Sequence, residues 1–247
     1  MGTRGGPGAL RRQLEASGAD VVAIVHAETT TGVLNPVQQL AAVAREHGAL
    51  TIVDAVTSLG GHKLDVGACT QKCLGGPAGM APVVFGLRAL EKRVRCRSFY
   101  FDLALLEDYW LRRKYHHTMS STLIYALYEA LAIVEKEGLD ARWARHERNH
   151  RELLGSLNTL DLGVLPREGE RLWTLNAVRV PDGVDEAAVR KHLLDEFNIE
   201  IGAGLGPLAG KIWRVGLMGA SSSPRLIVLL RGALESAFAK QGRHVHA

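Results

Sequence analysis

The sequence predicts an α/β protein with two parts, a truncated, mainly parallel large domain at residues 1–138 and a small α+β domain at residues 139–247. Two apolar runs, residues 21–25 and 50–53, flank an amphipathic segment at 37–46, and this strand–helix–strand order is typical of parallel sheets. Near residue 138 the composition changes to a charged helix followed by a short alternation of strands and helices. That alternation is typical of small α+β domains.

The elements of the first part follow from apolar periodicity and turn residues. Residues 9–17 are amphipathic and predict a short helix, while the β-branched runs at 21–25 and 50–53 are typical of strands buried on both faces. The helix at 37–46 should begin after Pro36, with Asn35 as its N-cap, and end at Gly48. Further along we expect a strand at 82–85 and helices at 88–94, 102–113 and 121–136.

The second part should begin with a charged helix at 142–154 that stops at Gly155. A strand at 172–180, a turn at 181–183 and a helix at 184–197 follow. Strands at 199–201 and 212–217 and a final helix at 225–239 complete the predicted small domain.

Composition places the chain among ordinary globular proteins, with 47% hydrophobic and 23% charged residues in a length of 247. The net charge of +4 comes from scattered arginines without interleaved aromatic residues, which favours a solvated surface over a nucleic-acid interface. No run is long enough to span a membrane, and the first residues lack the apolar core of a secretion signal. The sequence therefore predicts a soluble, cytoplasmic protein.

The cysteines and histidines predict neither a disulfide framework nor a metal site. Three cysteines are an odd number, so reduced thiols are the simplest account. Cys69 and Cys73 have a spacing compatible with zinc, but His146 and His150, which would complete such a site, belong to the other predicted domain. The pair at 116–117 has no suitably spaced third ligand.

Three single residues could carry chemistry, and each has an alternative interpretation. Asp54 ends an apolar strand, where ligands bind in open α/β sheets, but it could equally be a turn aspartate. Lys72 lies before a glycine-rich stretch that would allow close approach to a cofactor, although most lysines are surface charges. Arg214 lies in an apolar strand and would need an anionic partner, either a substrate carboxylate or an internal acid.

Five motifs in one order resemble the class V pyridoxal-phosphate-dependent aminotransferases. They are HAETTTGV at 26–33, LTIVDAVTSLGG at 50–61, TQKCLGGPAG at 70–79, KYHHT at 114–118 and IEIGAGLGPLAGK at 199–211. Within that class the last two resemble the alanine–glyoxylate (serine–pyruvate) aminotransferases. The resemblance implies a fold of the type I pyridoxal-phosphate transferases and amino transfer from alanine or serine to glyoxylate or pyruvate.

The resemblance also implies which residues bind the cofactor, pyridoxal 5′-phosphate. Lys72 would be the Schiff-base lysine, and Asp54 would bond the pyridine nitrogen. Gln71 would contact the cofactor phosphate, and Thr29 would lie near the ring's O3 atom.

Three further residues acquire roles from the same resemblance. Tyr115 and Thr118 would reach the phosphate of the neighbouring subunit in a homodimer, and Arg214 would hold the substrate α-carboxylate. The expected partners are therefore small amino acids, 2-oxo acids and a second copy of the chain.

The chain departs from the family pattern in two places. It lacks about the first third of a family chain, and a short strand of roughly six to eight residues before Gln71 and Lys72. These departures keep open a non-catalytic fragment that folds or dimerises without cofactor. A cysteine-desulfurase-like enzyme is a further alternative, although those enzymes usually have a histidine where this chain has Gln71.

Overall fold

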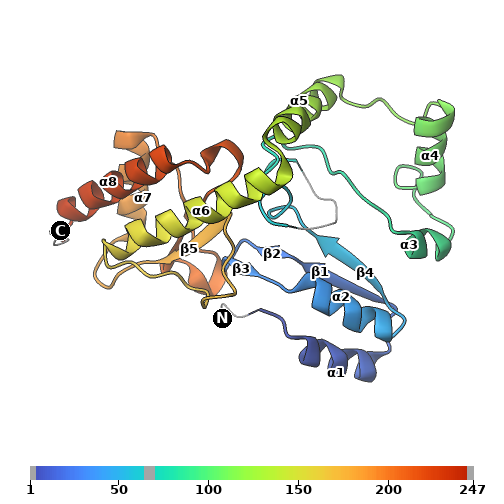
Figure 1. Cartoon of the computed structure of the whole chain (residues 1–247), viewed down its shortest axis with the longest axis horizontal. Coiled ribbons are helices and arrows are strands. Elements are labelled where there is room, and N and C mark those ends of the chain that lie inside the picture. The colour runs from blue at the N-terminus through green and yellow to red at the C-terminus, as the bar shows by residue number, and fades with distance from the viewer. Residues whose placement is uncertain (1–3, 64–69, 244–247) are drawn as a thin grey trace.

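The structure is a computed structural model that describes residues 4–63 and 70–243 (Figure 1). The N-terminal part contains a parallel pair of strands, β1 (Val21–Val25) and β4 (Leu50–Asp54). Helices α1 (Pro7–Ser17) and α2 (Val37–Glu46) cover one face of this pair. Their contact surface is apolar, with Leu14, Ile24 and Leu40 in one buried cluster. The predicted strand–helix–strand unit and both of these helices are confirmed.

The other face of the β1–β4 pair is open, so the prediction that both strands are buried on both faces is wrong. Val21 is 47% exposed, Val25 41% and Ile52 60%. Burial of both faces of a parallel sheet requires covering elements on both sides. Within the described residues, helices lie on one side only (Figure 1).

Asn35 does not cap α2, in contrast to the prediction. The N-cap position is Pro36, and the Asn35 side chain instead makes hydrogen bonds to backbone groups outside the helix. Its Nδ2 donates to the Val25 carbonyl (2.8 Å), and its Oδ1 accepts from the Gly5 amide (3.0 Å). The side chain therefore ties the start of the chain to the end of β1. Just before it, strands β2 (Ala27–Glu28) and β3 (Val33–Leu34) form an antiparallel hairpin that the sequence did not predict.

Residues 82–120, here called the arm, form a long excursion that carries α3 (Leu87–Glu91) and α4 (Leu103–Arg112) (Figure 1). Arg88 of α3 donates to the carbonyls of Gly48 and Ala49 just before β4. The strand predicted at 82–85 is absent, and Val83 and Val84 are 67% and 69% exposed. A strand needs a partner, and no strand of the described chain lies beside this segment. Helix α3 is also shorter than predicted, whereas α4 and α5 (Ser121–Glu137) agree with the prediction.

The C-terminal part packs helices on an antiparallel sheet of order β5–β7–β6, formed by β5 (Leu175–Arg179), β7 (Ile212–Gly216) and β6 (Gly202–Ala203). Helices α6 (Leu139–Asn158), α7 (Glu186–Phe197) and α8 (Pro224–Lys240) bury Trp213 and Phe238 in the largest core cluster. Two short 3-10 helices, η1 (Gly206–Leu208) and η2 (Gly219–Ser221), flank β7.

Two predictions in this part are wrong in detail. Helix α6 continues through Gly155, because Leu153 and Leu157 on either side are almost fully buried and their packing outweighs the glycine cost of about 1 kcal/mol. The strand predicted at 199–201 lies instead at β6, where Gly202 pairs with Arg214.

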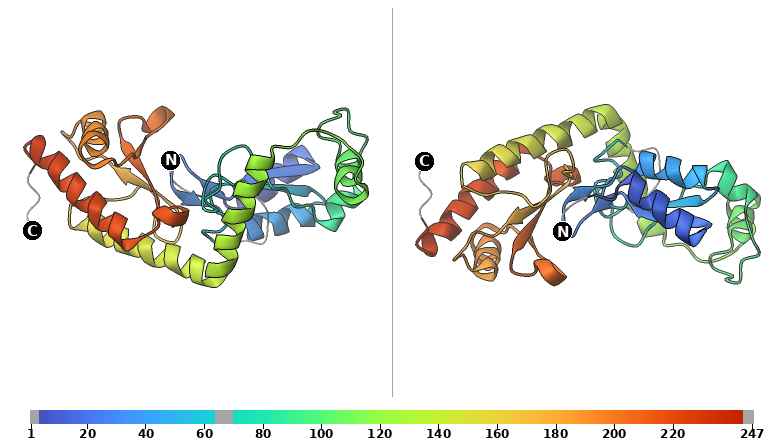
Figure 2. Two further views of the ribbon diagram at one scale, coloured as in Figure 1. Left: turned by 90° about the horizontal axis from the view of Figure 1, so that it is seen from above. Right: turned by 90° about the horizontal axis from the view of Figure 1, so that it is seen from below.

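Helices α5 and α6 meet at an angle at Gly138, whose φ is 80° (Figure 2). The predicted division of the chain at residue 138 coincides with this bend, but the division itself stays a prediction. The position before Lys72 at which the chain lacks the short strand of the family pattern falls within residues 64–69, outside the described residues. None of the helices described is long and apolar enough to cross a membrane.

Candidate active site

The turn that carries Lys72, residues 70–76 and here called the lysine turn, lies against the loop that follows Asp54. Buried Cys73 donates from its thiol to the Thr57 carbonyl (3.2 Å), and Thr174 of the C-terminal part donates to the same oxygen (3.2 Å). Gly61 allows this approach, because a Cβ there would lie 2.3 Å from Thr174 Cγ2 and 2.8 Å from Cys73 Sγ. The fold thus brings the segments that hold Lys72 and Asp54 into contact.

The lysine turn is closed by its own hydrogen bonds. The Gly75 amide donates to the Lys72 carbonyl (3.0 Å), and the Gly76 amide donates to the Thr70 carbonyl (3.0 Å). The buried Thr70 hydroxyl donates to the Pro77 carbonyl (2.6 Å). These bonds define the backbone of the turn while the Lys72 side chain remains half-buried.

Asp54 is exposed at the carboxyl end of β4 and also fulfils the alternative role of a turn aspartate. Its Oδ1 accepts from the Val56 amide (2.9 Å), and its carbonyl oxygen accepts from the His26 amide (2.8 Å). An ionised carboxylate has about four acceptor positions, so this bond leaves acceptor capacity for a protonated ring nitrogen.

Two buried histidines near this loop have no counterpart in the sequence prediction. The Nδ1 atom of His26 lies 2.8 Å from the Ser58 hydroxyl, which also donates to the Ala55 carbonyl. The ring of His62 is stacked on Trp173. Burial lowers the pKa of His26 to about 4 and, together with the nearby His26, that of His62 to about 3. Both rings are therefore neutral near pH 7.

Thr29 and Gln71 are the remaining predicted cofactor residues of this region. Thr29 lies half-buried in the turn between β2 and β3, and Gln71 is exposed on the lysine turn. The turn of Thr29 packs on β5, since a Cβ at Gly32 would lie 3.5 Å from Ala177 Cβ. The turn of Thr29 therefore packs on the face of the C-terminal sheet that carries the Ala177 side chain.

Arg214 lies on β7 opposite Ala177, so its side chain shares that face of the sheet. The side chain is half-buried, and Nε donates to the Ala203 carbonyl (2.7 Å). Among the ion pairs of the described residues, none involves Arg214, which disfavours the internal-acid alternative. Its terminal nitrogens can still donate to a carboxylate.

Tyr115 and Thr118 do not join this group; they lie between α4 and α5. The Tyr115 hydroxyl lies 2.9 Å from Thr118 Oγ1, and Tyr115 is 76% exposed. Both line a cavity of about 440 Å³ with neighbouring residues of α4 and α5, including Tyr109 and Tyr125. Nearby, His116 is stacked on Phe99.

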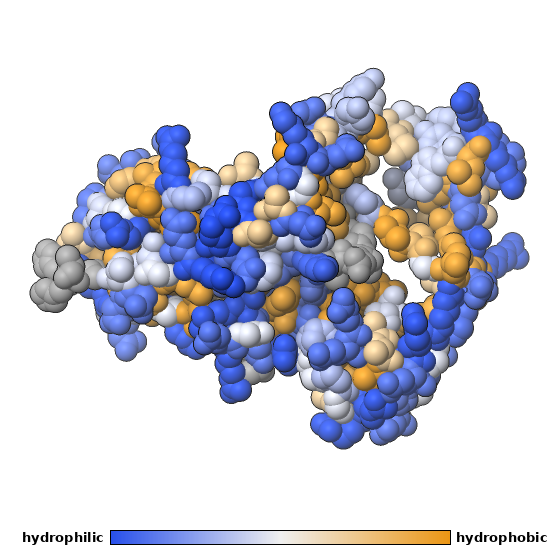
Figure 3. Space-filling view, viewed as in Figure 1, coloured by the Kyte–Doolittle hydropathy of each residue, from blue (hydrophilic) through white to orange (hydrophobic). Residues whose placement is uncertain are grey.

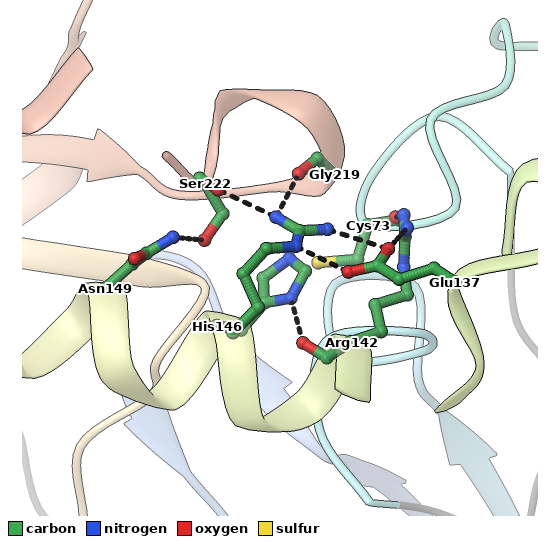
Figure 4. Close-up of polar contacts among 8 residues, drawn as sticks. Cys73, Glu137, Arg142, His146, Asn149, Gly219 and Ser222 are labelled. Carbon is green, nitrogen blue, oxygen red and sulfur yellow. Dashed lines mark hydrogen bonds and ion pairs between the residues drawn. The ribbon is translucent and has the colours of Figure 1, made fainter. Parts of the chain in front are cut away.

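A network of one carboxylate and two guanidinium groups lies beside the lysine turn (Figure 4), and the sequence prediction missed it. Glu137, the last residue of α5, pairs with Arg142 Nη1 (2.5 Å) and Arg145 Nε (2.5 Å) of α6. Hydrogen bonds from Arg145, followed by those from Arg142, outweigh partial burial and lower the pKa of Glu137 to about 2. The acid is therefore ionised at neutral pH.

The histidines and the thiol considered for zinc have other environments. Burial raises the pKa of the Cys73 thiol to about 11, and Cys69 lies outside the described residues. The Nδ1 atoms of His146 and His150 lie 2.8 Å from the Arg142 carbonyl and from Asn176 Oδ1 respectively. Within residues 4–63 and 70–243, no group of three or more His, Cys, Asp or Glu residues is arranged to hold a metal ion.

The donor set fits the expected pyridoxal phosphate. The lysine turn supplies an amine, and the end of β4 supplies a carboxylate to pair with a protonated ring nitrogen. Thr29 and Gln71 supply neutral donors for oxygen atoms of the ring and phosphate. Lys72 and Gln71 lie on the lysine turn, which contacts the loop after Asp54 at the carboxyl end of β4, whereas Thr29 lies in the turn between β2 and β3.

Comparison with known proteins gives a consistent result. The profile of the family described as aminotransferase class V matches residues 7–214. The chain is 34% identical over 277 residues to the (S)-ureidoglycine–glyoxylate transaminase of Bacillus subtilis, covering 100% of this chain and 67% of the relative.

Two solved structures are also close. The alanine–glyoxylate aminotransferase of Nostoc sp. has a TM-score of 0.91 and 42% identity, with 96% of this chain and 66% of that chain covered. The pyridoxamine–pyruvate aminotransferase of Mesorhizobium loti has a TM-score of 0.89 and 30% identity, with 98% and 66% covered. The chain spans between 56% and 67% of the length of its curated relatives. The matched residues and identities show that the chain belongs to the class V aminotransferase family.

Proposed function

We propose that the chain takes part in pyridoxal-phosphate-dependent amino transfer from a small amino acid, alanine or serine, to glyoxylate or pyruvate. The observation that carries the proposal is the contact between Cys73 and Thr57, which holds the segments of Lys72 and Asp54 together. The names of its relatives, which include glyoxylate and pyruvate aminotransferases, support the same acceptors.

When bound, pyridoxal phosphate supplies an aldehyde carbon for covalent attachment and an electron-accepting ring. In the proposal, the amine of Lys72 would hold the group covalently and, when free, would carry the proton that leaves the substrate Cα. Asp54 holds the proton at the ring nitrogen, because a carboxylate favours the charged form of that nitrogen. Gln71 and Thr29 orient the group through its phosphate and O3 atoms.

Arg214 binds the α-carboxylate of both amino and oxo acids in this proposal. Its Nε is held by the Ala203 carbonyl, which fixes the plane of the guanidinium and leaves the terminal nitrogens for a two-point contact. A fixed fork of this kind orients a small substrate without contacting its side chain.

A homodimer is the proposed assembly, with Tyr115 and Thr118 directed to the phosphate site of the neighbouring subunit. The arm exposes large apolar side chains, among them Phe101 at 74%, Trp110 at 59% and Leu111 at 80%. Figure 3 shows apolar side chains on the arm and α5 at the edges of a hollow. Exposed apolar surface of this extent is typical of protein–protein interfaces. Sedimentation of the full chain with and without cofactor tests this assembly.

A cytoplasmic location is also part of the proposal. Cys73 and Cys96 carry free thiols, and Cys96 is exposed. Exposed free thiols persist in a reducing compartment.

The test of the function uses the full chain and pyridoxal phosphate alone. Binding should give the yellow absorption band of a lysine–cofactor link, and borohydride should abolish the band and leave the adduct on Lys72. Amino transfer is then measured with alanine or serine as donor and glyoxylate or pyruvate as acceptor. An adduct on Lys63 or Lys211 would refute the assignment of Lys72, and an unreacted chain would support the non-catalytic alternative.

A further inference from the structure

We propose that Glu137, Arg142 and Arg145 are positioning residues that hold the lysine turn against η2, and so fix Lys72 relative to the strand that carries Arg214. The inference rests on the proposed function, because the position of Lys72 matters for chemistry only if this lysine binds the cofactor. The contacts that hold the lysine turn are present without cofactor.

The first contact joins α6 to the lysine turn. Arg142 Nη2 donates to the carbonyl oxygen of Cys73 (2.5 Å), the residue that follows Lys72 (Figure 4). The side chain of Arg142 is only 3% exposed, so this bond is sheltered from water. A buried charge-assisted bond to a backbone oxygen restrains the backbone of the turn directly.

The second contact joins α6 to the turn after β7. Arg145 Nη1 donates to the carbonyl oxygens of Gly219 (3.0 Å) and Ser222 (2.7 Å). The two turns also touch, since a Cβ at Gly219 would lie 3.4 Å from the Cys73 carbonyl oxygen and 3.8 Å from that of Lys72. Gly219 lies five residues after Arg214, so β7 leads directly into this contact.

Glu137 joins the two arginines into one unit. Its Oε2 accepts from Arg142 Nη1 (2.5 Å) and Arg145 Nη2 (3.0 Å), while Oε1 accepts from Arg145 Nε (2.5 Å). The carboxylate balances the buried charge of Arg142 and orients both guanidinium groups. Because Glu137 ends α5 and the arginines belong to α6, the network also spans the bend at Gly138.

The network differs from the other arginine pairs of α6 and α7. Arg151 pairs with Glu147 one turn away, and Arg190 pairs with Glu186 in the same way. Such pairs join two positions on a single helix and hold no second segment. Arg142 and Arg145, by contrast, donate to backbone oxygens of two turns that are far apart in the sequence.

Hydrogen exchange of the full chain without cofactor provides the first test, with Arg142→Lys compared to Arg151→Lys as the matched control on the same helix. A lysine keeps the charge but cannot donate to Glu137 and Cys73 with a planar fork. We expect the amides of Gly75 and Gly76 to exchange about tenfold faster in Arg142→Lys while the core of α8 keeps its protection. The control should match the parent chain.

A uniform increase in exchange throughout the protein would overturn the proposal, because it would show that Arg142 acts on stability alone. Unchanged exchange at Gly75 and Gly76 would also overturn it. Should Arg142→Lys fail to fold, Arg145→Lys provides the same test from the η2 side, where the amide of Ser222 reports the change.

The second test measures Lys72 itself with pyridoxal phosphate and borohydride. The yield of adduct on Lys72 is divided by the folded fraction of the same sample, measured by urea denaturation, so a change in overall stability is separated from a change at the lysine turn. Arg142→Lys should lower this ratio by about tenfold, since misplacement of a reacting group by about 1 Å has effects of this size or larger. An unchanged ratio would overturn the proposal. If the parent chain gives no Lys72 adduct, the proposed function fails, and hydrogen exchange still decides the role of the network.

Discussion

The imidazole of His62 is stacked on the indole of Trp173, with ring centroids 4.2 Å apart, and its Nε2 atom accepts a hydrogen bond from the Trp173 backbone amide (2.9 Å). A nitrogen that accepts a hydrogen bond must be unprotonated. The contact therefore joins the loop after β4 to the C-terminal part only while His62 is neutral.

The first prediction is a loss of stability in mild acid. The ordinary histidine pKa is 6.5, whereas burial lowers that of His26 and His146 to about 4 and that of His62 to about 3. Between these pKa values the unfolded chain binds more protons than the folded chain. The free energy of unfolding is therefore highest above the unfolded pKa of 6.5 and decreases as the pH falls toward the folded values. Each group contributes a loss of about 1.4 kcal/mol per pH unit within that window.

Urea denaturation between about pH 7.5 and about pH 5 measures the effect as a falling free energy of unfolding. His62→Gln should be less stable than the parent chain at neutral pH, because the stacking is lost, but its stability should depend less on pH. An equal slope in the two proteins would show that His62 is not held neutral by the fold.

The second prediction concerns Glu137→Gln, which leaves Arg142 buried without its counter-charge. Removal of one partner of a buried pair costs about 3–5 kcal/mol, and the exposed fraction of 24% at Glu137 places the expected loss near the lower limit, about 3 kcal/mol. The free energy of unfolding at neutral pH provides the measurement. The control is Glu147→Gln, whose partner Arg151 is 75% exposed, and it should change stability by less than about 1 kcal/mol. Equal losses in the two variants would contradict the prediction.

The elements that the sequence predicts well are those set by local patterns. Helix α8 begins at Pro224 after the capping serine Ser223, and Asp102 caps α4, so the chain signals these boundaries itself. The strand predicted at 82–85 shows the opposite case. Its β-branched composition is typical of a strand, but strand formation depends on a partner that a local pattern cannot supply.

Candidate site residues divide in the same way. Lys72 and Asp54 are recognisable because the chemistry is concentrated in short motifs around them. The positioning network is not recognisable, because its members come from α5, α6 and two distant turns, and their partners are backbone oxygens. Backbone acceptors leave no trace in the side-chain sequence. Only the buried position of Arg142 on the amphipathic helix α6, four residues before buried His146, could have drawn attention to it.

The third prediction is that Lys72→Ala abolishes the adduct with pyridoxal phosphate and leaves the fold intact. The lysine side chain is half-buried and the turn is closed by bonds of Thr70, Gly75 and Gly76, which the substitution does not touch. The free energy of unfolding should therefore change by less than about 1 kcal/mol. Absorbance after addition of cofactor and urea denaturation measure the two effects separately. Retention of the absorption band in this variant would assign the adduct to another lysine.

The fourth prediction is that the Asp54→Asn variant keeps most of its fold and loses most of the amino-transfer activity of the parent chain. Asparagine can still accept from the Val56 amide, so the turn is preserved, but a neutral amide cannot hold a proton on the ring nitrogen. Turnover with alanine and glyoxylate is compared with the thermal midpoint of unfolding. Parental turnover in Asp54→Asn would leave Asp54 as a turn residue only.

The fifth prediction is that Arg214→Lys weakens the use of both amino and oxo acids and leaves cofactor affinity nearly unchanged. Lysine retains the positive charge but offers no parallel pair of N–H donors, and it cannot donate from the Nε position to the Ala203 carbonyl while also contacting a carboxylate. The expected decrease in kcat/KM corresponds to a loss of about 1.5–3 kcal/mol of transition-state stabilisation, the range for a hydrogen bond to a charged group.

Separate measurement of cofactor and substrate decides what Arg214 does. The residue lies on β7 opposite Ala177, on the face of the sheet toward the Thr29 turn, and it has no acidic partner among the described residues. If Arg214 mainly supported the sheet, the substitution would lower stability and both affinities together, because β6 is attached to β7 beside it. If it binds the carboxylate, KM should rise equally for the amino donor and the 2-oxo acceptor, which share that group, while titration with pyridoxal phosphate should match the parent chain. A fall in cofactor affinity as steep as the fall in substrate use would reject the carboxylate role.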